Sequence, residues 1–181
     1  MPQTTDQSTD TPPEDTPTGV RIGHVNLKVA DLDRALTFYR DVLDFKVTKR
    51  IGDAAAFLAH GSYHHDICIN TWQSAGGAPP APGTTGLYHF AILYPTRRAL
   101  GQALLRLQAA GWPIDSAIDH GVGLSLYLRD PDGNGVELAW DRSPDHWRGS
   151  AGELIMGHRP IEPDAILHAT DEGSRGMAAT D

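Results

Sequence analysis

The chain repeats itself, and this internal duplication constrains its fold more than any other feature of the sequence. His24 followed by Arg34-Ala35-Leu36 in the first half corresponds to His89 followed by Arg98-Ala99-Leu100 in the second. Further along each half, Asn70-Thr71-Trp72 corresponds to Leu138-Ala139-Trp140. The identity is weak, but both echoes keep the same order along each half. This agreement indicates one supersecondary unit that is present twice.

The first half is typical of a strand, a helix and three further strands. From Arg21 to Val29, apolar and polar residues alternate with the period of two that a half-buried strand shows. Asp31 or Asp33 then provides a helix N-cap, and apolar residues recur at helical spacing through DLDRALTFYRDVLDF. Three later strands complete a βαβββ unit over about residues 20–73, around Phe45–Arg50, Ala54–Ala59 and His64–Trp72.

The second half repeats this order over about residues 86–141. The segment GLYHFAILY predicts a strand that carries His89, and residues 97–110 predict a helix that Gly111 ends. The remaining strands are expected at Ile114–Asp119, Leu124–Arg129 and Gly135–Trp140. A loop rich in Gly, Pro and Ala, QSAGGAPPAPGTTG, links the two repeats.

One globular domain is expected, at residues 20–168, with a tail at each end. Residues 1–19 contain Pro, Thr, Asp and Gln with almost nothing to bury, so ordering them would cost entropy without return. Residues 169–181 are similar in kind and are expected to be flexible. Between them and the second repeat, Ile161, Ile166 and Leu167 would allow a C-terminal extension to dock as a short element.

Composition narrows the class of protein. The formal net charge of −8 repels nucleic-acid phosphates, and no apolar run approaches the roughly 18 residues that a membrane span needs. The only cysteine, Cys68, excludes an internal disulfide framework, and the acidic N-terminus lacks the pattern of a secretory signal. We therefore expect a cytoplasmic protein with a small-molecule ligand and neither a nucleic-acid nor a membrane partner.

Three residues of ligand type stand at related places in the two repeats. His24 and His89 lie early in the first strand of each repeat, and Glu137 lies in the last strand of the second. A pseudo-two-fold relation between the repeats would bring the histidines together across a cavity. Two imidazoles and one carboxylate suit Fe(II), Mn(II), Zn(II) or Ni(II). A single histidine of this kind is more often an ordinary hydrogen-bonded strand residue, but the combination of three favours a metal site.

The sequence also resembles a known superfamily. HVNLKVADLDRALTFYRDVLDF resembles the first strand and helix of the vicinal oxygen chelate superfamily, which includes glyoxalase I, extradiol dioxygenases, fosfomycin-resistance enzymes and bleomycin-binding proteins. GLYHFAI and LYLRDPDGNGVEL are most similar to the extradiol catechol dioxygenases. The resemblance covers about residues 20–168. It implies an α+β fold in which two βαβββ repeats form an open mixed or antiparallel β-sheet barrel around a metal site.

The same resemblance implies an activity and its residues. It indicates an extradiol ring-cleaving dioxygenase that uses Fe(II), with a small aromatic diol and dioxygen as substrates and His24, His89 and Glu137 as metal ligands. Tyr127, ten residues before Glu137, matches the tyrosine of the family. The His64-His65 pair matches the family's acid–base position, and His65 is chosen on the resemblance alone.

Several alternatives stay open at this point. A glyoxalase-like lyase or isomerase with Zn(II) or Ni(II) would need a fourth ligand, for which only Asp66 is available, and a metal-free binding protein would need none of the three ligands. A second histidine that the family carries before its tyrosine has no equivalent at the same spacing, and His120 is only a near candidate. Exposed edge strands and the pairing of modules in the superfamily predict a homodimer.

Overall fold

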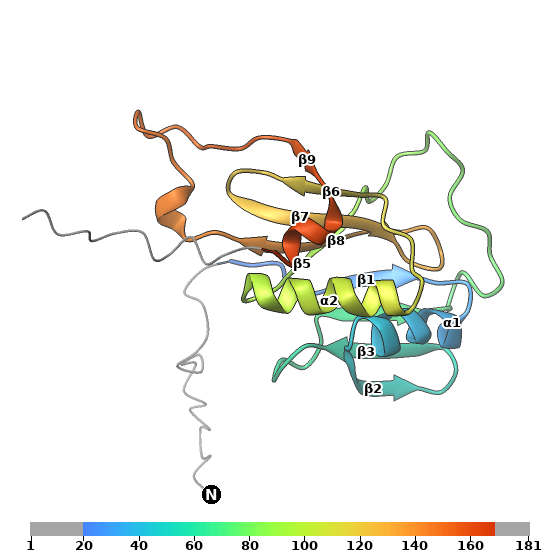
Figure 1. Cartoon of the computed structure of the whole chain (residues 1–181). Helices are drawn as coiled ribbons and strands as arrows, with labels where there is room; N and C mark the ends of the chain where they lie inside the picture. The colour runs from blue at the N-terminus through green and yellow to red at the C-terminus, as the bar shows by residue number, and fades with distance from the viewer. Residues whose placement is uncertain (1–19, 169–181) are drawn as a thin grey trace, which may run out of the picture.

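The computed structural model describes residues 20–168, so the two predicted tails, 1–19 and 169–181, lie outside the described residues. The first repeat, coloured blue to green in Figure 1, contains one helical segment and four strands. Its elements are β1 (Val25–Lys28), α1 (Leu32–Leu36) with a π-helical continuation (Thr37–Val42), β2 (Lys46–Ile51), β3 (Ala55–Ala59) and β4 (Ile67–Asn70). Asp31, one of the two predicted caps, accepts a hydrogen bond from the backbone N–H of Arg34 at 2.8 Å.

The second repeat has the same order of elements, which confirms the predicted duplication of a βαβββ unit. Its elements are β5 (Phe90–Leu93), α2 (Arg97–Ala109), β6 (Ser116–Asp119), β7 (Gly123–Arg129) and β8 (Gly135–Asp141). The C-terminal extension adds two 3-10 turns (Pro144–His146 and Pro163–Ile166) and the short strand β9 (Arg159–Ile161). Gly111 follows α2 with a φ of +62°, so the predicted helix stop is confirmed.

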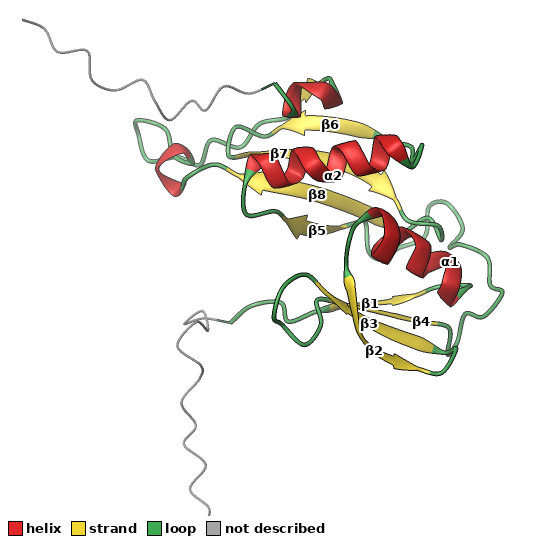
Figure 2. Cartoon of the chain, turned by 60° about the horizontal axis from the view of Figure 1, so that its bottom comes forward, coloured by secondary structure: helices red, strands yellow, loops and turns green. Residues whose placement is uncertain are grey.

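The strands form two separate mixed sheets. The first has the order β1-β4-β3-β2 and the second β5-β8-β7-β6-β9, with β1–β4 and β5–β8 parallel and the other neighbours antiparallel. β1 and β5 therefore occupy equivalent edges of their sheets, as the duplication requires. Figure 2 shows α2 in front of the second sheet and α1 beside the first. Among residues 20–168 no helix is long and apolar enough to cross a membrane.

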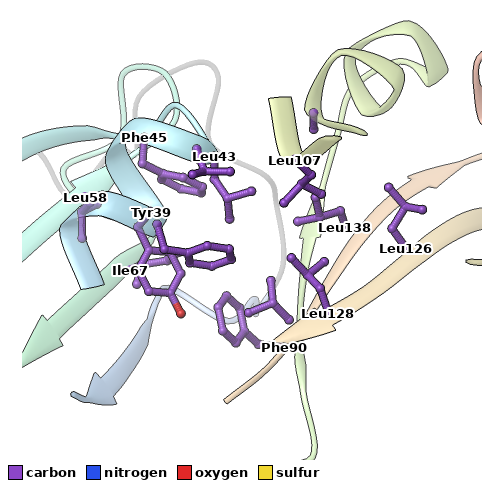
Figure 3. Packing of buried hydrophobic residues seen from close by; sticks show 14 of the residues in the cluster. Tyr39, Leu43, Phe45, Leu58, Ile67, Phe90, Leu107, Leu126, Leu128 and Leu138 are labelled. Atoms are coloured by element: carbon purple, nitrogen blue, oxygen red, sulfur yellow. The ribbon is translucent and has the colours of Figure 1, made fainter. Parts of the chain in front are cut away.

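One hydrophobic core joins the two repeats. Buried side chains from α1, α2 and both sheets form a single hydrophobic cluster, part of which is seen in Figure 3. The Phe38 ring lies 4.6 Å from the Trp112 ring, between centroids, and the Tyr39 hydroxyl donates a buried hydrogen bond of 2.8 Å to Asp130. Because the helix-covered faces of both sheets share this core, the repeats are held together on their helical side.

The sheets of the two repeats are open, as predicted. The α+β fold with two repeats is confirmed, but the two sheets are not closed into a barrel. The helix-free face of each sheet is left partly open instead. On β1, Asn26 and Lys28 are exposed, and on β5, Ala91 and Leu93 are exposed. The barrel was implied by the resemblance to the superfamily. The contacts between the helices, which set the placement of the repeats, are not visible in the strand pattern.

Candidate metal centre

The candidate residues of the second repeat lie on the face of the sheet that α2 does not cover. On β7, Leu126 and Leu128 belong to the core, so the alternation of side chains turns Tyr127 to the opposite face. On β8, Val136 and Leu138 belong to the core, and Glu137 therefore also faces away from the helix. The predicted alternation along these two strands is confirmed.

Glu137 is held by neighbours on both of its oxygens. Oε1 accepts hydrogen bonds from Ser125 Oγ at 2.6 Å and from Tyr127 Oη at 3.0 Å. Oε2 lies 3.0 Å from Nε2 of His89. Tyr127 and Glu137 are direct partners in the β7–β8 register, so the sheet itself sets this arrangement. The two hydroxyl donors orient the carboxylate and direct its second oxygen towards His89.

The pair formed by His89 and Glu137 fits two ligands of one cation. Ligands bound at about 2.0–2.2 Å and at right angles to each other are about 3 Å apart, close to the observed Nε2–Oε2 distance. Nδ1 of His89 is buried and has no hydrogen-bond partner among the described residues, so Nε2 is the nitrogen that the fold directs to the carboxylate. An imidazole nitrogen beside a carboxylate oxygen is a donor set that suits Fe(II), Mn(II), Zn(II) and Ni(II).

Tyr127 is built to stay protonated. Its burial, and then the negative charge of Glu137, raise the pKa of the Tyr127 hydroxyl to about 12. The hydroxyl also lies 2.9 Å from Nε2 of His120, whose Nδ1 lies 2.8 Å from the carbonyl oxygen of Gly157. Because a carbonyl only accepts, Nδ1 of His120 carries a proton, and Nε2 of a neutral His120 competes with Glu137 for the Tyr127 proton.

His24 and His65 lie together just before strands β1 and β4 of the first sheet. Their ring centroids are 4.4 Å apart, and His65 also packs on Phe57 at 5.0 Å. Burial, and then the neighbouring His24 and His64, lower the pKa of His65. His64 stacks on Tyr63 at 4.0 Å and is exposed. Both histidines of the pair precede β4 rather than lying within it, so the strand predicted from residue 64 begins later.

The structure does not bring the three predicted ligands together within one chain. His89 and Glu137 meet on the second sheet, whereas the ring neighbour of His24 on the first sheet is His65. Across residues 20–168, no three His, Cys, Asp or Glu side chains form a group able to hold a metal ion. Asp66, the only candidate for a fourth ligand, accepts a hydrogen bond from the backbone N–H of His60 at 2.8 Å.

A cavity of about 350 Å³ lies beside His89 and Tyr127. Tyr88, Arg129 and His158 also contribute to its wall. His158 reaches the cavity because the C-terminal extension is fixed to His120, whose carbonyl accepts a 2.8 Å hydrogen bond from Gly157 N–H. Neither Ser125 nor His158 was predicted from the sequence to belong to the site. Ser125 could have been found from its position two residues before Tyr127, whereas nothing in the local pattern indicates His158.

A sequence model of the Glyoxalase/Bleomycin resistance protein/Dioxygenase superfamily matches residues 21–138. The chain belongs to this superfamily. It is 39% identical over 153 residues to "Catechol-2,3-dioxygenase" of Bacillus subtilis (strain 168), covering 83% of this chain and 53% of that protein. It is 33% identical over 165 residues to "Biphenyl-2,3-diol 1,2-dioxygenase 2" of Rhodococcus globerulus, covering 85% of this chain and 83% of that one.

A solved structure has the same superfamily fold. The glyoxalase/bleomycin resistance protein/dioxygenase domain from Frankia sp. EAN1pec superposes with a TM-score of 0.57 at 25% identity, covering 71% of this chain and 98% of that domain. The chain spans about half the length of its Bacillus relative.

Proposed function

We propose that the protein is an extradiol ring-cleaving dioxygenase that acts on a catechol-like aromatic diol. The observation that carries this proposal is the cluster around Glu137, in which one carboxylate oxygen is held by two hydroxyl groups and the other adjoins His89. A protonated phenol, Tyr127, stands at the same carboxylate and beside a cavity. Two relatives whose names state dioxygenases of aromatic diols support the same reaction class.

The residues that would hold the metal are His24, His89 and Glu137. A bound Fe(II), with Mn(II), Zn(II) and Ni(II) as alternatives, would supply the electronic link between the diol and dioxygen. The 3.0 Å distance between Nε2 of His89 and Oε2 of Glu137 supports this assignment for two of the three residues. Glu137 offers Oε2 because Ser125 and Tyr127 occupy Oε1, so the carboxylate would bind without losing its orientation.

Tyr127 and His65 have separate roles in this proposal. Tyr127 would donate a hydrogen bond to a substrate oxygen, because a tyrosine phenol keeps its proton at neutral pH and Tyr127 borders the cavity. His120 would fix the Tyr127 hydroxyl from the other side. His65 would accept and return a proton, since imidazole changes its charge near neutral pH and the ring lies beside His24.

The proposal is tested by dioxygen uptake. Protein reconstituted anaerobically with Fe(II) is given a panel of catechols, and oxygen consumption is followed together with the absorbance of the yellow ring-cleavage product. Coupled uptake and colour are expected. If the protein binds metal but gives neither signal, a glyoxalase-like lyase would be favoured instead. If it binds no metal, a metal-free binding protein would be favoured. The cytoplasmic location and a role in the degradation of aromatic compounds remain predictions.

Glu137→Gln provides the matching prediction for the metal. The substitution keeps the shape of the side chain but removes a ligand charge, so we expect metal affinity to fall by about 10- to 100-fold or more. Glu162→Gln is the control, because Glu162 is exposed and lies in the C-terminal extension. Metal content after desalting is the measurement. Equal metal content in the two variants would mean that Glu137 is not a metal ligand.

A further inference from the structure

Strand β7 presents an arginine on the same face as Tyr127. Leu126 and Leu128 belong to the core, so the alternation that turns Tyr127 away from the helices turns Arg129 to the same side. Residues two positions apart on a strand are separated by about 7 Å, which is comparable to the length of a benzene ring with one substituent. A ring held at one end near Tyr127 would therefore bring its other end to Arg129.

Arg129 also forms part of the wall of the cavity beside His89 and Tyr127. Among the described residues, those that line this cavity include no lysine, and Arg129 is their one arginine. The volume of about 350 Å³ is at the lower end of the range for small-molecule sites and suits a single ring with a short substituent. Arg129 is thus the permanent cation of the described wall, and a negatively charged substituent would be attracted to it.

The neighbouring strand β8 leaves this cation uncovered. Gly135, two residues before Glu137, is the partner of Arg129 in the β7–β8 register, so β8 places no side chain opposite the guanidinium. A Cβ atom at Gly135 would collide with the carbonyl oxygen of Tyr88 and would lie 2.9 Å from Cβ of His89. Glycine at this position therefore allows His89 to approach β8 and at the same time leaves Arg129 without a side-chain neighbour from that strand.

The contacts of Arg129 leave one edge of its guanidinium available. Nη1 donates a 3.1 Å hydrogen bond to the carbonyl oxygen of Gly133, and Nε lies 3.4 Å from Oδ2 of Asp115. The contact with Asp115 is longer than the about 2.7–2.9 Å of a strong charge-assisted bond, and both side chains are at least half exposed, so this pair neutralises the arginine weakly. Nη2 has no hydrogen-bond partner among the described residues. Nη2 and the second Nη1 proton form the end of the guanidinium fork, which can bind a carboxylate through two parallel bonds.

We propose that Arg129 binds an anionic substituent of the substrate, so that the preferred diol carries a carboxylate group on its ring. This inference rests on the proposed function, because it places the diol oxygens of the same molecule at Tyr127. The carboxylate would bind both Nη atoms of the guanidinium, while Nε would keep its contact with Asp115. Arg129 would select and orient the substrate in this way and would take no part in the cleavage of the ring.

The binding of matched acids and amides tests this assignment. Fe(II)-loaded protein is titrated in the absence of dioxygen with two dihydroxybenzoates, one with the carboxylate next to the diol and one with it across the ring from a hydroxyl group. The amide of each acid has nearly the same shape and no charge. We expect the wild type to bind at least one acid about 10-fold more tightly than its amide. This preference should decrease at high salt, because the Arg129 side chain is exposed.

Arg129→Gln should abolish the preference for the acid, because the glutamine side chain is neutral. Arg148→Gln is the matched control. Arg148 is exposed and, like Arg129, donates a hydrogen bond to a carbonyl oxygen four residues later, but it lies outside the described cavity wall. Equal binding of each acid and its amide by the wild type, or an acid preference that survives in Arg129→Gln, would overturn the inference.

Oxygen uptake with unsubstituted catechol keeps this inference separate from the proposed function. A protein that takes up dioxygen with catechol but binds acids and amides equally would contradict only the role of Arg129. A protein that prefers the acids but takes up no dioxygen with any catechol would contradict only the proposed reaction.

Discussion

Two hydroxyl groups hold the same oxygen of Glu137, and they differ in what else they contact. Ser125 is buried and donates at 2.6 Å. Tyr127 donates at 3.0 Å, but it also borders the cavity and contacts His120. Ser125 is therefore placed to orient the carboxylate, and Tyr127 is placed to contact a substrate as well.

Tyr127→Phe separates these two tasks. Ser125 still holds Glu137 in this variant, so we expect metal content close to that of the wild type. Turnover of a catechol should fall by about 10- to 100-fold or more, because the donor to the substrate oxygen is lost. Tyr88→Phe is the control, since Tyr88 borders the same cavity and no hydrogen bond of its hydroxyl is found among the described residues. Equal turnover in the two variants would assign Tyr127 a structural role only.

At the scale of the elements, the C-terminal extension depends on Asp119 at the end of β6. Burial by itself would raise the pKa of this carboxyl group, but hydrogen bonds from Arg142, the backbone N–H of Gly121 and Arg159 outweigh it and lower the pKa to about 2. Arg142 lies at 2.9 Å and Gly121 at 2.8 Å. Asp119 thus connects β6 to the segment that carries His158.

Asp119→Asn should destabilise the protein in a pH-dependent way. The pKa of Asp119 is lower in the folded chain than in the unfolded chain, so its stabilisation is present above about pH 4 and is lost as the pH falls towards 2. We expect a loss of about 1–2 kcal/mol of unfolding free energy at pH 7 after allowance for solvent screening, and a smaller difference at pH 2.5.

Urea unfolding at both pH values measures this effect. Asp41→Asn is the control, because Asp41 pairs with Arg40 at an exposed site where an ion pair contributes little. A loss for Asp119→Asn that does not change between pH 7 and pH 2.5 would mean that the carboxylate charge is not the cause.

The sequence predicted the elements well where the signal was local. The strand that contains Tyr127 and the strand that contains Glu137 follow strict alternation, and their faces were assigned correctly. His64 and His65 were placed in a strand that begins only at Ile67, because the apolar run of β4 extends the pattern without marking its first residue. The π-helical turn after Leu36 was read as a regular helix, since both bury Phe38, Tyr39 and Val42.

At the scale of the whole molecule, the placement of the repeats could not be predicted from their order. The duplication predicted two equivalent units, and it is confirmed by the strand order of both sheets. Which faces of these units meet is decided by contacts distant in sequence, such as that from Tyr39 to Asp130. Neither residue carries a local signal for its partner. The prediction that His24 and His89 lie close together assumed a pseudo-two-fold relation that brings both histidines to one cavity. The two repeats of this chain are not arranged in that way.

Leu93→Asp would test that placement on the complete protein. Leu93 is 60% exposed on the same face of β5 as Ala91, so a charge there would be buried if this open face forms the interface of the predicted homodimer. We expect the dissociation constant of the dimer to rise by about 10- to 100-fold. Leu105→Asp is the control, since Leu105 is 51% exposed on α2 and lies away from the open sheet face.

Sedimentation velocity at two protein concentrations measures the dissociation constants of both variants. Equal dissociation constants for Leu93→Asp and Leu105→Asp would mean that the open face of β5 is not the interface of the predicted homodimer.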